Sequence, residues 1–243
     1  MSVESGIVGP SVAVTSMVVF GMISRTFLRL PMPRSVRNPW KWTNTFVSLV
    51  HSSLTGLGAL LCFYLAPDMT KDLITPVTMP SHLLVSLSTG YFMYDVLDLF
   101  VSKKAMSHWE LVLHHITVIS CFGCAVVTKL YTGFALVALT IELSSAFLHI
   151  RQLLHMGGVS KRNVIYRTNS MINIGMYILF RICTLAWMTR WIVINRDAVP
   201  IIPFTLGSVG LAIMTIINVF LFFRLLRSDF LQKKPKHKDW FSE

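Results

Sequence analysis

Charged residues are scarce in this chain of 243 residues: they make up 14% of it, against 53% hydrophobic residues. Acidic residues are the scarcer kind, with 11 Asp and Glu against 22 Lys and Arg. The net charge of +11 would suggest a nucleic-acid partner in a soluble protein. Here, however, the basic residues lie mainly between and after long apolar segments, a placement typical of membrane topology. We therefore expect a protein integral to a membrane, with no nucleic-acid partner.

Cysteine is also rare. Cys62, Cys121, Cys124 and Cys183 all lie in apolar segments, so no disulfide framework is predicted. Cys121 and Cys124 form a CxxC pair, but this pair lies in a hydrophobic stretch with no second pair to complete a metal site. Neither a metal nor a cofactor is predicted from these residues.

Long apolar runs dominate the rest of the chain. Seven of them approach the length needed to cross a hydrocarbon core of about 30 Å. The gaps between them contain proline and glycine and leave no room for a separate soluble domain. The sequence therefore predicts an all-α, polytopic transmembrane helical bundle of six to seven spans, at residues 6–24, 43–65, 81–101, 110–127, 134–150, 171–193 and 201–223.

Lys and Arg alternate between the loops. The first, third and fifth loops and the C-terminal tail are rich in them, while the other loops hold only Lys71, Lys129, Arg190 and Arg196. Because short cytoplasmic loops carry the basic excess, seven spans with the N-terminus outside and the C-terminus in the cytosol fit this alternation. The first apolar run is preceded by an acidic residue and followed by basic ones, which favours a retained anchor over a signal peptide.

Ionisable residues inside the predicted spans are few, and such residues are usually functional. They are His51, Tyr94, Asp95, Asp98, Glu110, His114, His115, Glu142, His149 and Arg181. Asn169, Asn173, Tyr177 and Arg181 recur every four residues and predict a polar stripe that faces the bundle interior. We expect a polar cavity that opens toward the cytosol, with Asp95, Asp98, Glu110, Glu142, Asn173 and Arg181 in it. The alternative is that these groups only pair with one another and hold the helices together.

Two adjacent histidines stand out in this set. His114 and His115 point about 100° apart on a helix, so they cannot readily bind one metal ion together. A histidine that faces Asp95 or Asp98 could instead act as a general base for an alcohol or an amine. Asp98 and His114 each lie about one turn from the same short connection and could meet across a helical hairpin.

Three segments carry a family resemblance: GYFMYDVLDLF (residues 90–100), HWELVLHHITVIS (108–120) and LTIELSSAFLHIRQLL (139–154). Together they resemble the TLC-domain family, over nearly the whole chain. The segment LPMPRSVRNPWKWTNTFVSLVHSSLTGLGALLC (30–62) and the string FRLLRSDF (223–230) narrow the resemblance to a small regulatory subgroup. The division that follows is an N-terminal anchor helix and basic loop (1–36), a TLC domain (37–230) and a basic cytosolic tail (231–243).

The resemblance implies a multi-pass plasma-membrane protein, with the endoplasmic reticulum as the other candidate location. It implies regulation of phospholipid composition, in particular the acyl-chain balance of phosphatidylethanolamine, and thereby of membrane fluidity. In the ceramide synthases of the family the paired histidines belong to an acyl-transfer site, and His114 and His115 match them. Their partner pattern is His-Asp-x-x-Asp, where this chain has Ile141, Glu142 and Ser145. This departure argues against ceramide synthesis.

Three functions stay open from the sequence. The first is a lipid-binding regulator without chemistry of its own. The second is an intramembrane acyltransferase that uses fatty acyl-CoA, with His114 or His115 as base and basic loops that attract the phosphates of the donor. The third is an accessory regulator of a channel through helix contacts, for which the sequence offers least support because its glycine pairs lack the GxxxG spacing.

Overall fold

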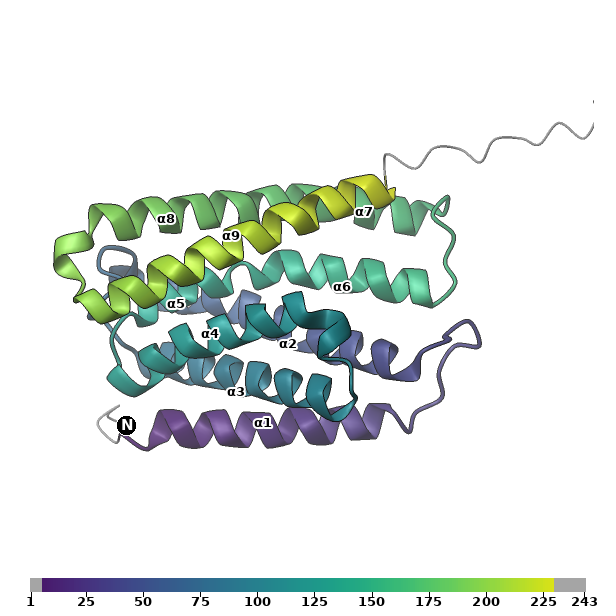
Figure 1. The fold of residues 1–243 in the computed structure, drawn as a ribbon, viewed down its shortest axis with the longest axis horizontal. Coiled ribbons are helices and arrows are strands. Elements are labelled where there is room, and N and C mark those ends of the chain that lie inside the picture. Colours follow the sequence, from purple (N-terminus) through teal and green to yellow (C-terminus); the bar gives the residue numbers. More distant parts are fainter. Residues whose placement is uncertain (1–5, 230–243) are drawn as a thin grey trace, which may run out of the picture.

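The computed structural model describes residues 6–229, and every regular element in that range is helical (Figure 1). The predicted basic tail (231–243) lies outside the described residues. Seven segments are long and apolar enough to span a membrane, which confirms the predicted polytopic bundle. The α-helices are α1 (Val8–Phe27), α2 (Pro39–Leu65), α3 (Met79–Val101), α4 (Trp109–Thr128), α5 (Thr132–Leu139), α6 (Glu142–Met156), α7 (Val164–Tyr177), α8 (Thr184–Ile194) and α9 (Ile201–Asp229).

Local capping sets where two of the spans begin. The side chain of Asn38 accepts a hydrogen bond of 3.0 Å from the Lys41 amide, and Pro39 takes the first turn of α2, where no amide hydrogen is needed. Thr78 and Ser81 form a reciprocal capping box at the start of α3. The second span therefore begins earlier than hydropathy alone predicts.

Two spans are interrupted rather than continuous. The fifth breaks between α5 and α6 at Thr140 and Ile141, which makes Glu142 the first residue of α6. A carboxylate is stabilised there because the helix N-terminus carries partial positive charge. The sixth contains a π-helical turn, Ile178–Cys183, between α7 and α8. Such turns are rare and often mark functional positions. Arg181 lies on this turn.

The helices run roughly along one direction and reverse at the two ends of the bundle (Figure 1). α1 packs against α3, α2 against α6, and α4 against α9. The α1–α3 contact is very close: a Cβ added at Gly90 would lie 2.0 Å from the carbonyl oxygen of Ala13. Beside it, the Ser16 hydroxyl donates a hydrogen bond of 2.6 Å to the Leu87 carbonyl. α1 is thus fixed to the outside of the bundle by backbone-to-backbone approach.

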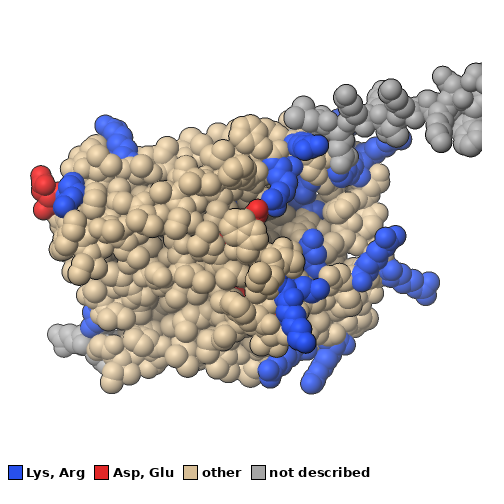
Figure 2. All heavy atoms as spheres, viewed as in Figure 1, with Lys and Arg blue, Asp and Glu red and all other residues tan. Residues whose placement is uncertain are grey.

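Basic residues gather at one end of the molecule. Figure 2 shows most of the Lys and Arg side chains at the end where the α1–α2, α3–α4 and α6–α7 connections lie, opposite the N-terminus. The middle of the bundle shows almost no charge on this face. Because short cytosolic loops carry the basic excess, this is the end that the sequence predicts to face the cytosol.

Candidate functional site

A cavity of about 570 Å³ occupies the basic half of the bundle. We call it the polar chamber. Its walls come from α2, α3, α4, α6, α9 and the π-helical turn. Polar chamber-lining side chains include those of Lys41, Asn44, Ser52, Asp95, Glu110, His114, His115, Glu142, Ser145, His149, Arg181 and Arg224. Polar groups at this depth would be unstable against lipid, so the chamber gathers them into one protected interior.

Asp95 is held from two sides. The Asn44 amide donates a hydrogen bond of 2.6 Å to its Oδ1, and Nδ1 of His115 lies 3.0 Å from its Oδ2. Both Asp95 and His115 are buried, with 2% and 5% of their surfaces exposed. Nδ1 of His115 thus lies beside a fixed carboxylate without forming a hydrogen bond in the described chain, and Nε2 is its remaining ring nitrogen. A carboxylate this close forms an ion pair with the imidazole when the ring is protonated.

His114 takes a different direction from its neighbour. The two imidazole rings stand edge to face at 71°, with centroids 5.2 Å apart. His114 lines the polar chamber and also a second cavity described below. Within residues 6–229 no three His, Cys, Asp or Glu side chains are grouped closely enough to hold a metal ion.

Glu142 begins α6 and faces the same two cavities. The Ser52 hydroxyl of α2 donates a hydrogen bond of 2.6 Å to its Oε2. Glu142 is therefore positioned by a neighbouring helix and by the break between α5 and α6.

Arg181 reaches the chamber from the π-helical turn and is 5% exposed. Its guanidinium donates to the hydroxyls of Ser144 and Ser145 and to Oδ1 of Asn218, at 2.9, 2.6 and 2.6 Å. The ring of Tyr177 lies 5.0 Å from its central carbon. All these partners are neutral.

The mouth of the chamber, at the basic end of the bundle, carries a further ion pair. Arg224 of α9 lies 3.3 Å from both carboxylate oxygens of Glu110 at the start of α4. This pair is largely exposed, with 65% and 45% of the two side chains accessible. Trp40 also lines the mouth, and its indole donates a hydrogen bond of 2.7 Å to Asp98.

The structure places some of the predicted cavity residues in the chamber and others outside it. Asp95, Glu110, Glu142 and Arg181 line the chamber together with both histidines. Asp98 bonds to Trp40 outside the lining, and Asn173 is fully buried with neither amide atom hydrogen-bonded in the described chain. The expected contact of Asp98 with His114 is replaced by that of Asp95 with His115, because the Trp40 indole of α2 binds Asp98 and the inward-facing acid of α3 is Asp95.

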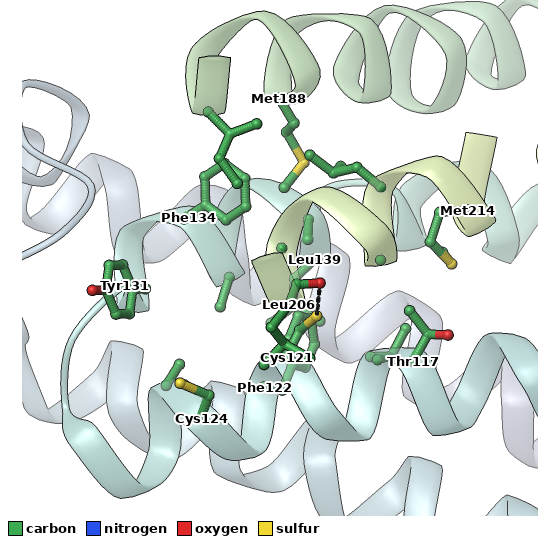
Figure 3. Close-up of a pocket in the computed structure, with 18 of the residues that line it drawn as sticks. Thr117, Cys121, Phe122, Cys124, Tyr131, Phe134, Leu139, Met188, Leu206 and Met214 are labelled. Atoms are coloured by element: carbon green, nitrogen blue, oxygen red, sulfur yellow. Dashed lines mark hydrogen bonds between the residues drawn. The ribbon is translucent and has the colours of Figure 1, made fainter. Parts of the chain in front are cut away.

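A second cavity of about 120 Å³ lies between α4, α5, α8 and α9, and Figure 3 shows how its walls converge. We call it the apolar slot. Apolar side chains such as Phe134, Leu139, Met188 and Met214 point into it. Cys121 and Cys124 also line it, and the Cys121 thiol lies 3.9 Å from the Leu206 carbonyl oxygen. The slot and the polar chamber share three wall residues: Phe92, His114 and Glu142.

Sequence reasoning missed several partners of these groups. Asn44, Ser52 and Asn218 position Asp95, Glu142 and Arg181 respectively. Asn218 offered a signal, since it is a lone amide within a long apolar run. The two others gave none, because polar residues are common in α2.

Comparison with known proteins agrees with this architecture. The TLC domain family model matches residues 41–227. TLC domain-containing protein 2 of Danio rerio is 49% identical over 235 residues, which cover 93% of this chain and 95% of the relative. TLC domain-containing protein 2 of Homo sapiens is 37% identical, with 93% and 86% covered. TLC domain-containing protein 1 of Homo sapiens is 33% identical, with 92% of each chain covered. The chain therefore belongs to the TLC-domain family, a family of membrane proteins related to lipids.

Proposed function

We propose that this protein binds a single phospholipid within the bilayer and thereby regulates membrane phospholipid composition and fluidity. The observation that carries the proposal is that the polar chamber and the apolar slot are adjacent and share Phe92, His114 and Glu142 in their walls. A lipid has a charged head joined to an apolar chain. A polar and an apolar cavity side by side are complementary to that chemistry.

The position of the chamber sets the source of the lipid. Its mouth is formed by Trp40, Lys41, Ser107 and His108, which lie at the basic end of the bundle. A phospholipid of the cytosolic leaflet has its head group at this level. The slot extends from the shared wall toward Tyr131 in the α4–α5 connection and Val199 in the α8–α9 connection, the direction in which the acyl chain of such a lipid would run.

We propose phosphatidylethanolamine as the lipid and its acyl-chain balance as the regulated quantity, in the plasma membrane. The support is the family resemblance carried by residues 90–100, 108–120 and 139–154. The mixed charge of the chamber, with carboxylates and basic groups facing one space, also suits a zwitterionic head group better than an anionic one.

The experiment compares bound lipid with surrounding lipid. The full chain is extracted from cells into native-like lipid discs, and the lipids retained after exchange into detergent are identified by mass spectrometry. We expect phosphatidylethanolamine to be enriched over its share in the disc. Cells that overproduce the protein should show a shifted acyl-chain profile of the same lipid. Retained lipid with the composition of the bulk membrane, together with an unchanged cellular profile, would contradict the proposal.

Acyl transfer is the second candidate, and the Asp95–His115 contact favours it. In this reaction Nε2 of His115 would accept the proton of a lipid alcohol or amine as that group attacks the thioester carbonyl of fatty acyl-CoA. The new ester or amide bond forms as the carbon–sulfur bond breaks, and the proton passes to the departing thiolate. Asp95 would hold the imidazole in position.

Thiol release tests the second candidate directly. Purified protein is mixed with acyl-CoA and a lysophospholipid, and free CoA thiol is measured with time. Under this candidate, wild type releases thiol and His115→Ala reduces the rate by about 10²-fold or more, the usual contribution of a general base. His155→Ala, an exposed histidine at the same end, should leave the rate unchanged. If wild type releases no thiol, acyl transfer is contradicted and lipid binding without chemistry remains as the proposed function.

A further inference from the structure

The charges that face the polar chamber are mostly paired within the protein. Asp95 faces His115, and Glu110 faces Arg224. Lys41 lies exposed at the mouth, where water and the membrane surface can solvate it. Two opposite charges, those of Glu142 and Arg181, belong to neither pair.

Arg181 is the more unusual of the two. It is 5% exposed, yet among residues 6–229 no carboxylate forms an ion pair with it. Its three hydrogen-bond partners, Ser144, Ser145 and Asn218, hold the guanidinium in place without neutralising it. A guanidinium has five N–H donors, so two are left for another acceptor. A buried uncompensated cation inside a membrane protein is unfavourable unless a counter-charge joins it.

Glu142 lies close by with the opposite sign. Arg181 bonds to Ser145, and Glu142 lies three residues before Ser145 on α6, so the two project toward one face of that helix. No ion pair joins Glu142 and Arg181 among the described residues. Glu142 accepts a hydrogen bond from Ser52 of α2 instead, and Arg181 donates one to Asn218 of α9. Both Glu142 and Arg181 line the polar chamber.

We infer that Arg181 and Glu142 are the two poles of a head-group subsite, Arg181 for the phosphate and Glu142 for a primary ammonium. A phosphate diester takes up paired N–H donors of a guanidinium. The ammonium of an ethanolamine head follows its phosphate after two carbon atoms, so one head group carries both charges into the single chamber that Arg181 and Glu142 line. An ammonium with three N–H groups donates hydrogen bonds to a carboxylate, whereas the trimethylated nitrogen of choline has none to donate.

This inference rests on the proposed function and adds which lipid head groups the site distinguishes. Phosphatidylethanolamine satisfies both poles, phosphatidylcholine satisfies only Arg181 fully, and diacylglycerol satisfies neither. The apolar slot contributes equally to all three lipids when their acyl chains are identical. The head group alone therefore sets the order of affinities.

The test is native mass spectrometry of the delipidated, detergent-purified full chain with one lipid added at a time, all with the same acyl chains. Wild type should bind phosphatidylethanolamine about tenfold more tightly than phosphatidylcholine, and phosphatidylcholine more tightly than diacylglycerol. Equal affinity for the two phospholipids would overturn the role of Glu142. Equal affinity for phosphatidylcholine and diacylglycerol would overturn that of Arg181. These wild-type measurements need no variant to fold.

Variants of Glu142 and Arg181 then test the role of each residue separately. Glu142→Gln should bring the two phospholipids to equal affinity, while Arg181→Gln should bring both down to the level of diacylglycerol. Arg190→Gln, an exposed arginine of the same span, and Asp68→Asn, an exposed acid, are the matched controls and should change nothing. Phospholipid binding that persists unaltered in both site variants would refute the head-group subsite and leave the proposed function standing. A wild-type protein that retains none of the three lipids would refute both.

Discussion

Nδ1 of His115 lies 3.0 Å from Oδ2 of Asp95 across the interface between α3 and α4, and both side chains are almost completely buried. Asn44 holds the other oxygen of the same carboxylate. The contact therefore links three helices. Because both side chains are buried, water cannot take the place of a partner that is removed. Its consequences can be measured independently of any lipid.

A double-mutant cycle tests this contact. Asp95→Asn and His115→Ala should each lower the free energy of unfolding by about 2 kcal/mol, because each removes one member of a buried polar contact from which water is excluded. The double variant should be less destabilised than the sum by about 1 kcal/mol, since the second change removes a group that has already lost its partner. Unfolding by SDS titration in mixed micelles provides the measurement, with the exposed His155→Ala as control. Strictly additive effects would show that the two groups do not interact.

Gly210 of α9 provides a test of the apolar slot. A Cβ there would lie 3.2 Å from the Cys121 sulfur and 3.3 Å from a methyl carbon of Thr117, so a valine must intrude on the slot. Overpacking of this kind costs about 1–3 kcal/mol, which corresponds to about a tenfold loss of affinity for a long-chain lipid. We expect Gly210→Val to shift the retained lipids toward shorter chains with the head group unchanged. Mass spectrometry of bound lipid measures the shift.

Gly175→Val is the matched control for that experiment, because nothing lies within 4 Å of a Cβ added at Gly175 in α7. It carries the same loss of helix flexibility without filling the slot. If both variants retained the same chain lengths as wild type, the slot would not be the site of the acyl chain.

The C-terminal end of α9 is held by a buried ion pair. Arg151 of α6 donates to both oxygens of Asp229, and 15% and 4% of the two side chains are exposed. Asp229→Asn should lower the free energy of unfolding by about 3 kcal/mol, because the arginine loses its buried counter-charge. Hydrogen–deuterium exchange should also rise in the last turn of α9.

The exposed pair of Lys71 with Asp68 is the control for this prediction, since 79% and 84% of its side chains are accessible. Asp68→Asn should change stability by less than about 1 kcal/mol, because water screens the interaction. An equally small effect of Asp229→Asn would mean that the end of α9 is fixed by other contacts.

The outer loop gives a prediction for pH. The hydroxyl of Thr75 and the amide of Ile74 donate hydrogen bonds to the Asp72 carboxylate, and they lower its pKa below 3.8. A lowered pKa means that this stabilisation is fully present above the unfolded value of about 4 and is lost as pH falls through the folded value. Protection of the Ile74 amide against exchange, corrected for intrinsic rate, should therefore decline only in acid.

Asp72→Asn should weaken that protection at neutral pH and remove its dependence on acid. Asp197→Asn, an exposed acid on the same side of the membrane, should leave the profile unchanged. Protection of Ile74 that stays constant down to pH 2 in wild type would show that the carboxylate does not hold the turn.

The prediction of the spans from sequence succeeded for a physical reason. Hydrocarbon excludes unpaired backbone groups, so a long apolar run has few alternatives to a spanning helix. The seven spans follow from that constraint, whereas the cytosolic orientation of the basic end stays a prediction. The same reasoning located Asp95, His114, His115, Glu142 and Arg181 as interior polar groups, because each would be unfavourable against lipid.

The sequence by itself thus determined which segments cross the membrane and which polar residues they carry inward. Only the tertiary structure decided which of those residues meet, because that depends on the rotation and depth of each helix against its neighbours. Asp95 rather than Asp98 faces a histidine, and it is His115 rather than His114. The break in the fifth span and the π-helical turn in the sixth, both invisible to hydropathy, place Glu142 and Arg181 in the wall of one chamber. Their hydrogen-bond partners result from packing, since Ser52 and Asn218 come from helices distant in the chain.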